Sequence, residues 1–417
     1  MKKKLALVLL LKNREPALLV SGQTVSNFGD GVALVALTLL VYDTTGSLTK
    51  LAWFAAARMT PLVIFLLIGG AIVDRFSRRV LLIISDVARA ILTGVLVIMI
   101  ATGLLRFWEL MVFGALFGCF DALFFPAISA LTPEIVPEDL LPAMNALRPL
   151  SNNLMGGMIG PAVGGVLAAN STSIAMGVDC ATFVVSAGAL LLMKPTPKPS
   201  RQEENSMFDD IKEGVHYVRQ TRWIWTTLVA VALVNAFLFS PMFVLIPFFL
   251  LHNLHYAKIY VGFLGVASGV AGVVGALIMS NLPSPKRRIR VMWIYWSIGT
   301  LSALIMGVAT NFWEIIFFPI IVSPMMIFGN VIWESMLQSE VPRELLGRVG
   351  SVDWFVSLGV APLGLVLAGE IANYVGIRTY FVLLCAICVV PGLYILKSER
   401  INVIDENRVH PTPAAAP

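Results

Sequence analysis

Charged residues are scarce in this chain of 417 residues, since Asp, Glu, Lys and Arg make up 13% of it, whereas soluble domains carry about 25%. Hydrophobic residues make up 58%, and the mean hydropathy is +0.84. Apolar stretches of roughly 20 residues recur, each long enough to cross a bilayer core of about 30 Å. Because β-barrel strands are shorter and alternate in polarity, we expect an all-α integral protein of the cell (inner or plasma) membrane.

Motifs of several pump and enzyme classes are missing. The sequence has no G-x-x-x-x-G-K-[ST] phosphate loop, which argues against an ATP-driven pump, and no H-E-x-x-H or G-x-S-x-G motif. Its four cysteines lie in apolar segments, where packing is the expected role, and its four histidines avoid the interior of the predicted spans. We therefore expect no enzymatic activity, no catalytic residue, no cofactor, no metal and no nucleic-acid partner.

The apolar runs predict twelve transmembrane helices, several of which contain Pro and Gly, as membrane helices tolerate. The expected spans are residues 17–42, 49–73, 80–103, 106–131, 143–169, 171–193, 223–251, 257–281, 291–309, 312–338, 350–374 and 377–396. Most of the 30 Lys and Arg residues lie near the two termini and in the breaks after every second span. Basic residues accumulate on the cytoplasmic side, so both termini are expected to be cytoplasmic.

The longest break between spans, residues 194–222, divides the chain in two. It begins with a linker-like KPTPKPSRQEEN and continues as SMFDDIKEGVHYVRQTRW, which has the early acids and late bases of a surface helix. Six spans precede the break and six follow, and VPEDLL after the fourth span is echoed by VPRELL after the tenth. We expect a monomer with six-helix halves at 1–193 and 223–396, followed by a disordered tail at 397–417.

Residues 69–79, GGAIVDRFSRR, separate two apolar runs with one Asp and three Arg. The arginines suit a cytoplasmic turn near phospholipid headgroups. Asp74 does not, because a carboxylate at a helix C-terminus opposes the helix dipole and needs a basic side chain or a facing helix N-terminus. We therefore expect a gating contact formed by Gly70, Asp74, Arg75, Arg78 and Arg79.

The expected span at 143–169 carries the pattern G-x-x-x-G-P-x-x-G-G. Small residues four apart let helices touch backbone to backbone, and a proline bends the span. A kinked, closely packed helix suits a segment that moves against its neighbour, although static helix packing explains the same spacing. The residues concerned are Gly156, Gly160, Pro161, Gly164 and Gly165.

Both patterns resemble signatures of the major facilitator superfamily of transporters. Residues 69–79 are similar to G-x-x-x-D-[RK]-x-G-[RK]-[RK], with Ser77 in place of the second glycine. The glycine–proline pattern resembles the antiporter signature of that family, whose additional upstream glycine would fall at Leu147. The stretches NFGDGVALVAL, AARMTP, GGAIVDR and QSEVPRELLGRV resemble the branch of macrolide-efflux and enterobactin-exporter proteins, over roughly residues 15–396.

The resemblance implies the major facilitator fold and transport by alternating access. In that family the loop Asp contacts the start of the eleventh helix, which here is residues 346–350, LGRVG. The antiporter signature accompanies proton-driven exporters, so the resemblance favours efflux over uptake.

Charges inside the predicted spans require a role, because each costs several kcal/mol there unless it is paired or hydrated. Asp30 and Arg58 lie at similar depth in the first two spans, so we expect them to form an ion pair near the midplane. That pair serves either to fix the two helices or to move protons, and the sequence leaves both roles open. Asp86 and Arg89 are three residues apart and are expected to pair within one helix.

Asp121, in GCFDALFFP, has no evident partner in the sequence, and Asp179 also lies deep in its span. An unpaired carboxyl group in apolar surroundings binds a proton near neutral pH, as a proton carrier must. Many drug/proton relatives carry an arginine in the fourth helix, and this chain has none there, which puts a direct transfer of their proton relay in doubt. The candidates for proton coupling are Asp30, Arg58, Asp121 and Asp179.

The second half differs, because its ionisable residues Glu334 and Asp353 lie near the ends of their spans. Polar side chains among aromatic and methionine residues are left as candidates for a cargo cavity, namely Asn235, Phe239 and Asn330. A cavity charged on one wall and apolar on the other suits an amphiphilic cargo.

The sequence as a whole predicts a secondary active transporter that exports small amphiphilic compounds such as drugs in exchange for protons. Its expected partners are the small-molecule substrate, protons and membrane lipids. The alternatives are a siderophore or metabolite exporter, or a lipid transporter of the same fold. A membrane scaffold without transport activity is the alternative of a different class.

Overall fold

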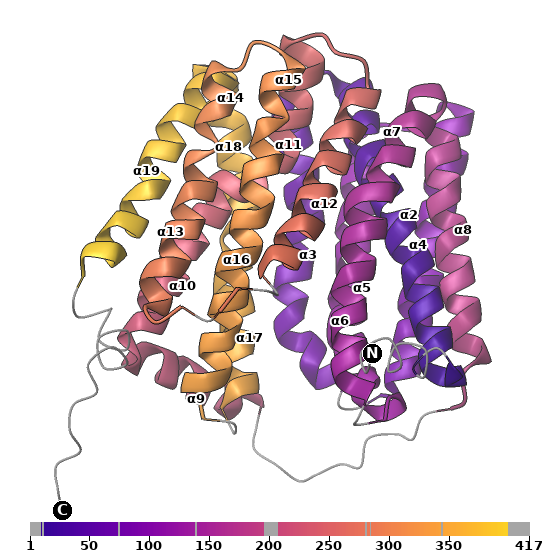
Figure 1. Ribbon diagram of the computed structural model, residues 1–417. Coiled ribbons are helices and arrows are strands. Elements are labelled where there is room, and N and C mark those ends of the chain that lie inside the picture. Colours follow the sequence, from indigo (N-terminus) through magenta and orange to yellow (C-terminus); the bar gives the residue numbers. More distant parts are fainter. Residues whose placement is uncertain are drawn as a thin grey trace, which may run out of the picture. The chain divides into compact units, whose positions relative to one another are not determined.

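The computed structural model describes residues 10, 12–73, 76–137, 140–195, 207–279, 282–283, 285–342 and 345–398 (Figure 1). All secondary structure in these ranges is helical, as the sequence predicts. Eleven helices of the described ranges are long and apolar enough to cross a membrane. The chain is therefore an all-helical, multi-pass membrane protein.

The segment expected to span the membrane at 143–169 is not one of these eleven, although it is helical throughout. It consists of α6 (Leu141–Ser151), the π-helix η2 (Asn152–Ile159) and α7 (Gly160–Asn170). Pro161 lies two residues after the end of the π-helix and has no N–H to donate to the carbonyl of Gly157. The turn before it widens, so that the N–H of Gly160 donates to the carbonyl of Met155.

The chain forms two compact units. Unit 1 comprises Met1–Glu204 and Val244–Val270, and unit 2 comprises Asn205–Phe243 and Ala271–Pro417. Residues Val244–Val270 thus pack with unit 1, although they lie within the segment expected to form the second half.

The helices of unit 1 are α2 (Arg14–Thr45), α3 (Leu48–Val73), α4 (Arg78–Thr102), α5 (Phe107–Ile135), α6, η2, α7, α8 (Thr172–Leu192) and η4 (Phe249–Asn253). Those of unit 2 are α9 (Met207–Gln220), α10 (Arg222–Val234), η3 (Asn235–Phe239), α13 (Arg288–Leu301), α14 (Leu304–Val308), α15 (Phe312–Ile315), α16 (Phe317–Glu340), α17 (Leu346–Gly359), α18 (Ala361–Val375) and α19 (Ile377–Lys397). The boundaries between the units fall inside α11 (Ser240–Phe248) and α12 (Ile259–Met279).

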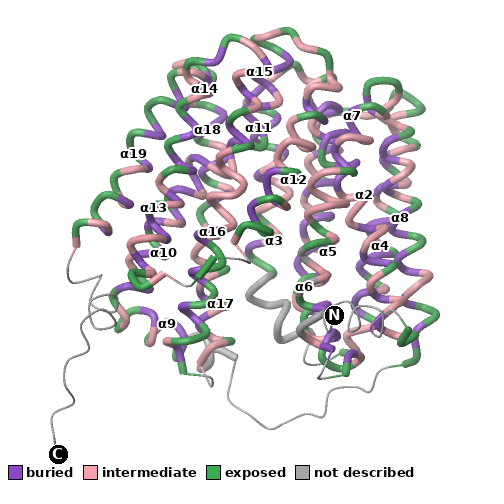
Figure 2. Tube along the Cα trace, in the orientation of Figure 1, coloured by how far each residue is buried: buried purple, intermediate pink, exposed green. Residues whose placement is uncertain are grey.

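In unit 1, α2 packs along α8 and α7, α3 packs along α5, and α4 contacts both α5 and α8 (Figure 1). The faces of α4 show why these helices associate in lipid (Figure 2). Its buried face includes the polar residues Ser85, Asp86, Arg89 and Thr93. Its exposed face carries Ile84, Val87, Ile91, Val95 and Ile98. Polar groups inside and apolar groups outside are the distribution expected of a helix that faces a bilayer.

In unit 2, α13 packs along α16 and α19, and α17 contacts both α9 and α10. Its core contains four buried tryptophans, Trp223, Trp293, Trp296 and Trp333. The rings of Trp223 and Trp333 meet edge to face, with centroids 5.6 Å apart. Large aromatic side chains in such pairs contribute more than their buried area alone, so this cluster stabilises the bundle.

Helix α9 lies in the second part of the expected linker at 194–222 and docks on α17. Its Glu213 forms an ion pair with Arg348, near the start of α17. The Tyr217 hydroxyl donates a hydrogen bond to the carbonyl oxygen of Glu340 at 3.5 Å. Val218 is buried in the core of unit 2, so the amphipathic pattern of this segment corresponds to a helix with one face on the protein.

Candidate functional site

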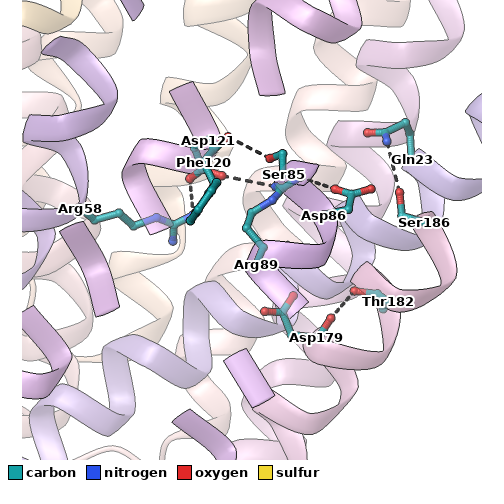
Figure 3. Close-up of polar contacts among 10 residues, drawn as sticks. All are labelled: Gln23, Arg58, Ser85, Asp86, Arg89, Phe120, Asp121, Asp179, Thr182 and Ser186. Carbon is teal, nitrogen blue, oxygen red and sulfur yellow. Dashed lines mark hydrogen bonds and ion pairs between the residues drawn. The ribbon is translucent and has the colours of Figure 1, made fainter. Parts of the chain in front are cut away.

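Four charged residues of unit 1, of which all but the partly exposed Arg58 are buried, form one continuous chain of ion pairs (Figure 3). Arg58 of α3 contacts Asp121 of α5, with Nη2 3.1 Å from Oδ2. The other oxygen of Asp121 lies 3.3 Å from Nη1 of Arg89, on α4. Arg89 in turn contacts Asp86 of the same helix, with Nη2 2.5 Å from Oδ1. The expected pair of Asp86 and Arg89 is therefore confirmed.

The expected ion pair between Asp30 and Arg58 is wrong, because Arg58 pairs with Asp121 instead. The cause is the close packing of α3 on α5, where a Cβ placed on Gly118 would overlap the carbonyl oxygen of Arg58. With glycine there, the two backbones touch and Arg58 reaches Asp121, which lies one turn further along α5. The expectation that Asp121 lacks a partner is wrong for the same reason.

Aromatic rings surround the two arginines. The guanidinium of Arg89 lies 4.4 Å from the ring centroid of Phe124 and 4.6 Å from that of Phe183. The guanidinium of Arg58 lies 4.6 Å from the ring of Phe117. Ring faces attract cations and exclude water. They therefore cover the faces of the two guanidinium groups that the carboxylates do not contact, and help to hold them in place.

Asp30 and Asp179 stand beside this chain of pairs. Asp179, on α8, is 0% exposed, and neither of its carboxyl oxygens has a hydrogen-bond partner among the described residues. Asp30, on α2, is partly exposed and is close enough to interact electrostatically with Arg89 and Arg58. All four proton-coupling candidates therefore lie around one buried site in unit 1, although whether they carry protons stays a prediction.

The glycine–proline segment packs against α2 next to this site. A Cβ on Gly160 would lie 2.6 Å from the carbonyl oxygen of Phe28, and one on Gly164 would lie 2.6 Å from that of Val32. Asp30 lies between these two contact points in the sequence of α2. Of the other motif residues, Gly156 faces α2 whereas Pro161 and Gly165 also contact α12 around Gly262.

The gating loop is only partly within the described residues. Asp74 and Arg75 lie outside them, and Gly70 lies in the last part of α3. Arg78 forms an ion pair with Glu134 near the end of α5. Arg79 donates from Nε to the carbonyl of Leu190 at 2.7 Å and from Nη2 to that of Leu191 at 2.8 Å. These two arginines therefore fasten the ends of α5 and α8, a common role of basic side chains near helix C-termini.

The cavity candidates of the second half make polar contacts within unit 2. Asn235 donates from Nδ2 to the carbonyl of Ser357 at 3.1 Å, and Asn330 accepts from Nε1 of Trp296 at 3.2 Å. Phe239 is partly buried in η3, two residues before Pro241. Whether these three residues line a cargo site remains a prediction.

One ion pair of unit 1 could not be predicted from the sequence. Lys258, before α12, pairs with Asp43 in the last turn of α2, although 215 residues separate them. The ring of Tyr42 meets that of Phe248 edge to face nearby, with centroids 5.6 Å apart. Only the packing of Val244–Val270 with unit 1 brings these residues together.

A family model described as transmembrane secretion effector (MFS_3) matches residues 11–415 of the chain. The chain belongs to this family of the major facilitator superfamily. It is therefore a membrane transporter and not an enzyme, and the resemblance seen in the sequence is confirmed.

Relatives of this transporter include drug exporters. The multidrug efflux pump Tap of Mycobacterium tuberculosis is 27% identical over 407 residues, which cover 94% of this chain and 96% of the pump. Macrolide efflux protein A of Streptococcus pyogenes is 21% identical over 368 residues, covering 87% and 90% of the two chains. The crystal structure of the nucleoside transporter NupG has the same fold, with a TM-score of 0.70 over 92% of this chain and 99% of NupG at 11% identity.

Proposed function

We propose that this protein is a secondary active transporter that exports small amphiphilic compounds such as drugs in exchange for protons, by alternating access. The observation that carries the proposal is the chain of ion pairs through Arg58, Asp121, Arg89 and Asp86, of which all but Arg58 are buried. A charged residue at the centre of a membrane helix costs about 2.5–3.5 kcal/mol. A membrane scaffold has no need of such a cluster, whereas a proton-coupled transporter does.

The proposed cargo is amphiphilic and carries a positive charge. Four aspartates and two arginines lie around the site in unit 1, so its ionised form has an excess of negative charge. We propose that Asn235, Phe239 and Asn330 of unit 2 contact the apolar part of such a compound. Relatives named for multidrug and macrolide efflux support this choice over siderophores, metabolites or lipids.

The proposed architecture has twelve transmembrane helices, with the run through α6, η2 and α7 as the fifth. Its functional halves are residues 1–193 and 223–396, joined by the linker at 194–222. Both termini face the cytoplasm of the cell, since most basic residues lie on that side. We propose a monomer, in which the glycine contacts between α7 and α2 let the helices shift during the change of access.

The test uses everted membrane vesicles from cells that overproduce the protein, with vesicles lacking it as the control. Respiration builds a proton gradient, which a pH-sensitive dye reports. Lipophilic cations, macrolides and catecholate siderophores are then added one at a time. We expect at least one lipophilic cation or macrolide to dissipate the gradient only in vesicles that contain the protein.

Two outcomes would count against the proposal. A response to siderophores alone would assign a different cargo. Accumulation of a labelled cargo that persists after the proton gradient is collapsed would show that protons do not drive export.

A further inference from the structure

Asp179 differs from the buried acids Asp86 and Asp121 of unit 1 in having no ion-pair partner among the described residues. Its side chain is 0% exposed, and both carboxyl oxygens lack a hydrogen-bond partner among the described residues. The Thr182 hydroxyl donates to the backbone carbonyl of Asp179 at 2.7 Å and not to its carboxyl group. Figure 3 shows this bond as the one dashed line that reaches Asp179. An ionised carboxylate in such a place is far costlier than a neutral carboxylic acid.

Charged groups surround Asp179, but none of the described residues forms an ion pair with it. Among the helices packed against α8, α4 contributes Asp86 and Arg89, α2 contributes Asp30, and α7 contains no ionisable residue. On α8 itself the neighbour is the thiol of Cys180. Arg58 and Asp121 act from α3 and α5.

The two arginines neutralise only two of the four aspartates around this site. Arg58 and Arg89 are matched by Asp121 and Asp86, with which they form ion pairs. Asp30 and Asp179 remain as two acids that form no ion pair among the described residues. Asp30 is among the charged groups close enough to act on Asp179.

The backbone brings these two acids together at Gly29. A Cβ at this position would overlap the Thr182 hydroxyl and lie 2.8 Å from Oδ1 of Asp179. Asp30 is the next residue of α2 and is partly exposed, whereas Asp179 is sealed. Of these two acids, Asp30 is therefore the one with some exposure to water.

We propose that Asp179 is a proton-binding residue of the transporter, neutral in this conformation, and that Asp30 is the group through which it exchanges its proton. The O–H bond of Asp179 breaks, an O–H bond forms on Asp30, and Asp30 then releases the proton to water. Asp86 and Asp121 keep their ion pairs with Arg89 and Arg58 and hold the two guanidinium groups in position. The inference rests on the proposed proton-coupled transport and names the residue that holds the proton.

Arg89 provides the response to proton release. Its Nε–H is buried and has no acceptor among the described residues. Ionised Asp179 attracts this guanidinium, which contacts the ring of Phe183, four residues further along α8. When Asp179 loses its proton, the attraction between its carboxylate and Arg89 therefore changes how α4 packs on α8. Protonation is in this way linked to helix packing.

The direct test is infrared spectroscopy of the purified full-length protein at neutral pH, where a protonated carboxyl group gives its own C=O stretching band. We expect the band in the wild type, its loss in Asp179→Asn and its retention in Asp86→Asn, which changes an equally buried but ion-paired acid. Asp179→Glu should keep the band at a shifted position. Absence of the band from the wild type, or its survival in Asp179→Asn, would overturn the inference. Size-exclusion profiles verify that each variant is folded. If Asp179→Asn does not fold, the shift of the band in Asp179→Glu tests the inference instead.

A transport measurement separates this inference from the proposed function. In proteoliposomes, Asp179→Asn should lose the accumulation of labelled tetraphenylphosphonium that a pH gradient drives, whereas Asp179→Glu, which keeps a titratable carboxyl group, should retain it. Gradient-driven accumulation that survives in Asp179→Asn would refute the role of Asp179 while leaving proton-coupled transport intact. If the wild type moves none of the compounds of the vesicle assay, the proposed function fails, and the infrared band still decides whether Asp179 holds a proton.

Discussion

Unit 1 and unit 2 are both bundles of apolar helices, but their interiors differ in chemistry. In unit 1 the interior holds Arg89, whose side chain is 3% exposed, with carboxylates on two sides. In unit 2 the interior holds four tryptophans, and the acid Asp353 accepts hydrogen bonds from Trp333 at 2.9 Å and Ser357 at 3.1 Å. No arginine or lysine pairs with Asp353 among the described residues.

The difference shows that two bundles of similar apolar helices can serve different purposes, one functional and the other stabilising. Burying a paired charge is costly and rarely stabilises a protein more than apolar packing does, so the ion pairs of unit 1 point to function. Aromatic packing contributes stability directly, so unit 2 needs no such charges. We therefore place proton coupling in unit 1 and expect each change below to affect the two units unequally.

Removing Arg89 should have the largest effect. Among the described residues, Arg89→Met leaves Asp86 with no ion-pair partner and Asp121 with one of two. Breaking a buried pair from one side costs about 3–5 kcal/mol of stability. Thermal unfolding in detergent should show a large loss, and the double change Arg89→Met/Asp86→Asn should regain part of it. Equal stability of Arg89→Met and the wild type would show that the network is not buried as described.

Crowding the glycine contact of unit 1 should have the next largest effect. In Gly164→Ala the new methyl group lies 2.6 Å from the carbonyl oxygen of Val32, and overpacking of this kind costs about 1–3 kcal/mol. Gly350→Ala in α17 of unit 2 is the matched control, because a Cβ there meets nothing within 4 Å. Thermal unfolding should separate the two variants, and a loss of the same size in both would contradict the close approach at Gly164.

Neutralising the acid of unit 2 should have a smaller effect. Asp353→Asn keeps one carbonyl acceptor for Trp333 or Ser357 and removes a charge that has no ion-pair partner among the described residues. We expect a change of about 1 kcal/mol, the scale of one hydrogen bond. Tryptophan fluorescence during thermal unfolding measures it. A loss of stability as large as that of Arg89→Met would contradict the difference proposed between the two units.

The ion pair of Asp43 and Lys258 should have the smallest effect, because both side chains are more than a quarter exposed. Exposed pairs contribute about 0.2–1 kcal/mol. Asp43→Lys should lower the unfolding temperature slightly, and adding Lys258→Asp should restore it. Failure of the exchange to restore stability would mean that the pair does not form in solution.

The sequence predicted the helical class, the family and the residues of the charged site, because these depend on composition and local spacing. Asp86 and Arg89 were paired correctly since three residues separate them on one helix. The helical segments also agree within a few residues, for example α4 at Arg78–Thr102 against the expected 80–103.

The partners of Arg58 and Lys258 could not be predicted because they depend on which helices pack together. Sequence neighbours suggested Asp30 for Arg58, but Gly118 brings α5 against α3 and supplies Asp121. The π-helix before Pro161 was not predicted either. A proline in the sequence predicts a bend, but it does not show that the preceding turn widens into a π-helix. Asp74 and Arg75 lie outside the described residues, so the expected gating contact stays a prediction.

The central claim, that proton coupling resides in unit 1, is tested most directly by two matched double variants in proteoliposomes. One is Asp30→Asn/Asp179→Asn of unit 1, and the other is Glu334→Gln/Asp353→Asn of unit 2. Each is measured for accumulation of tetraphenylphosphonium under an imposed pH gradient and for exchange of the same compound without a gradient. We expect the unit 1 variant to lose gradient-driven accumulation and keep exchange, while the unit 2 variant keeps both. Loss of gradient-driven accumulation in the unit 2 variant, with the unit 1 variant unaffected, would contradict the claim.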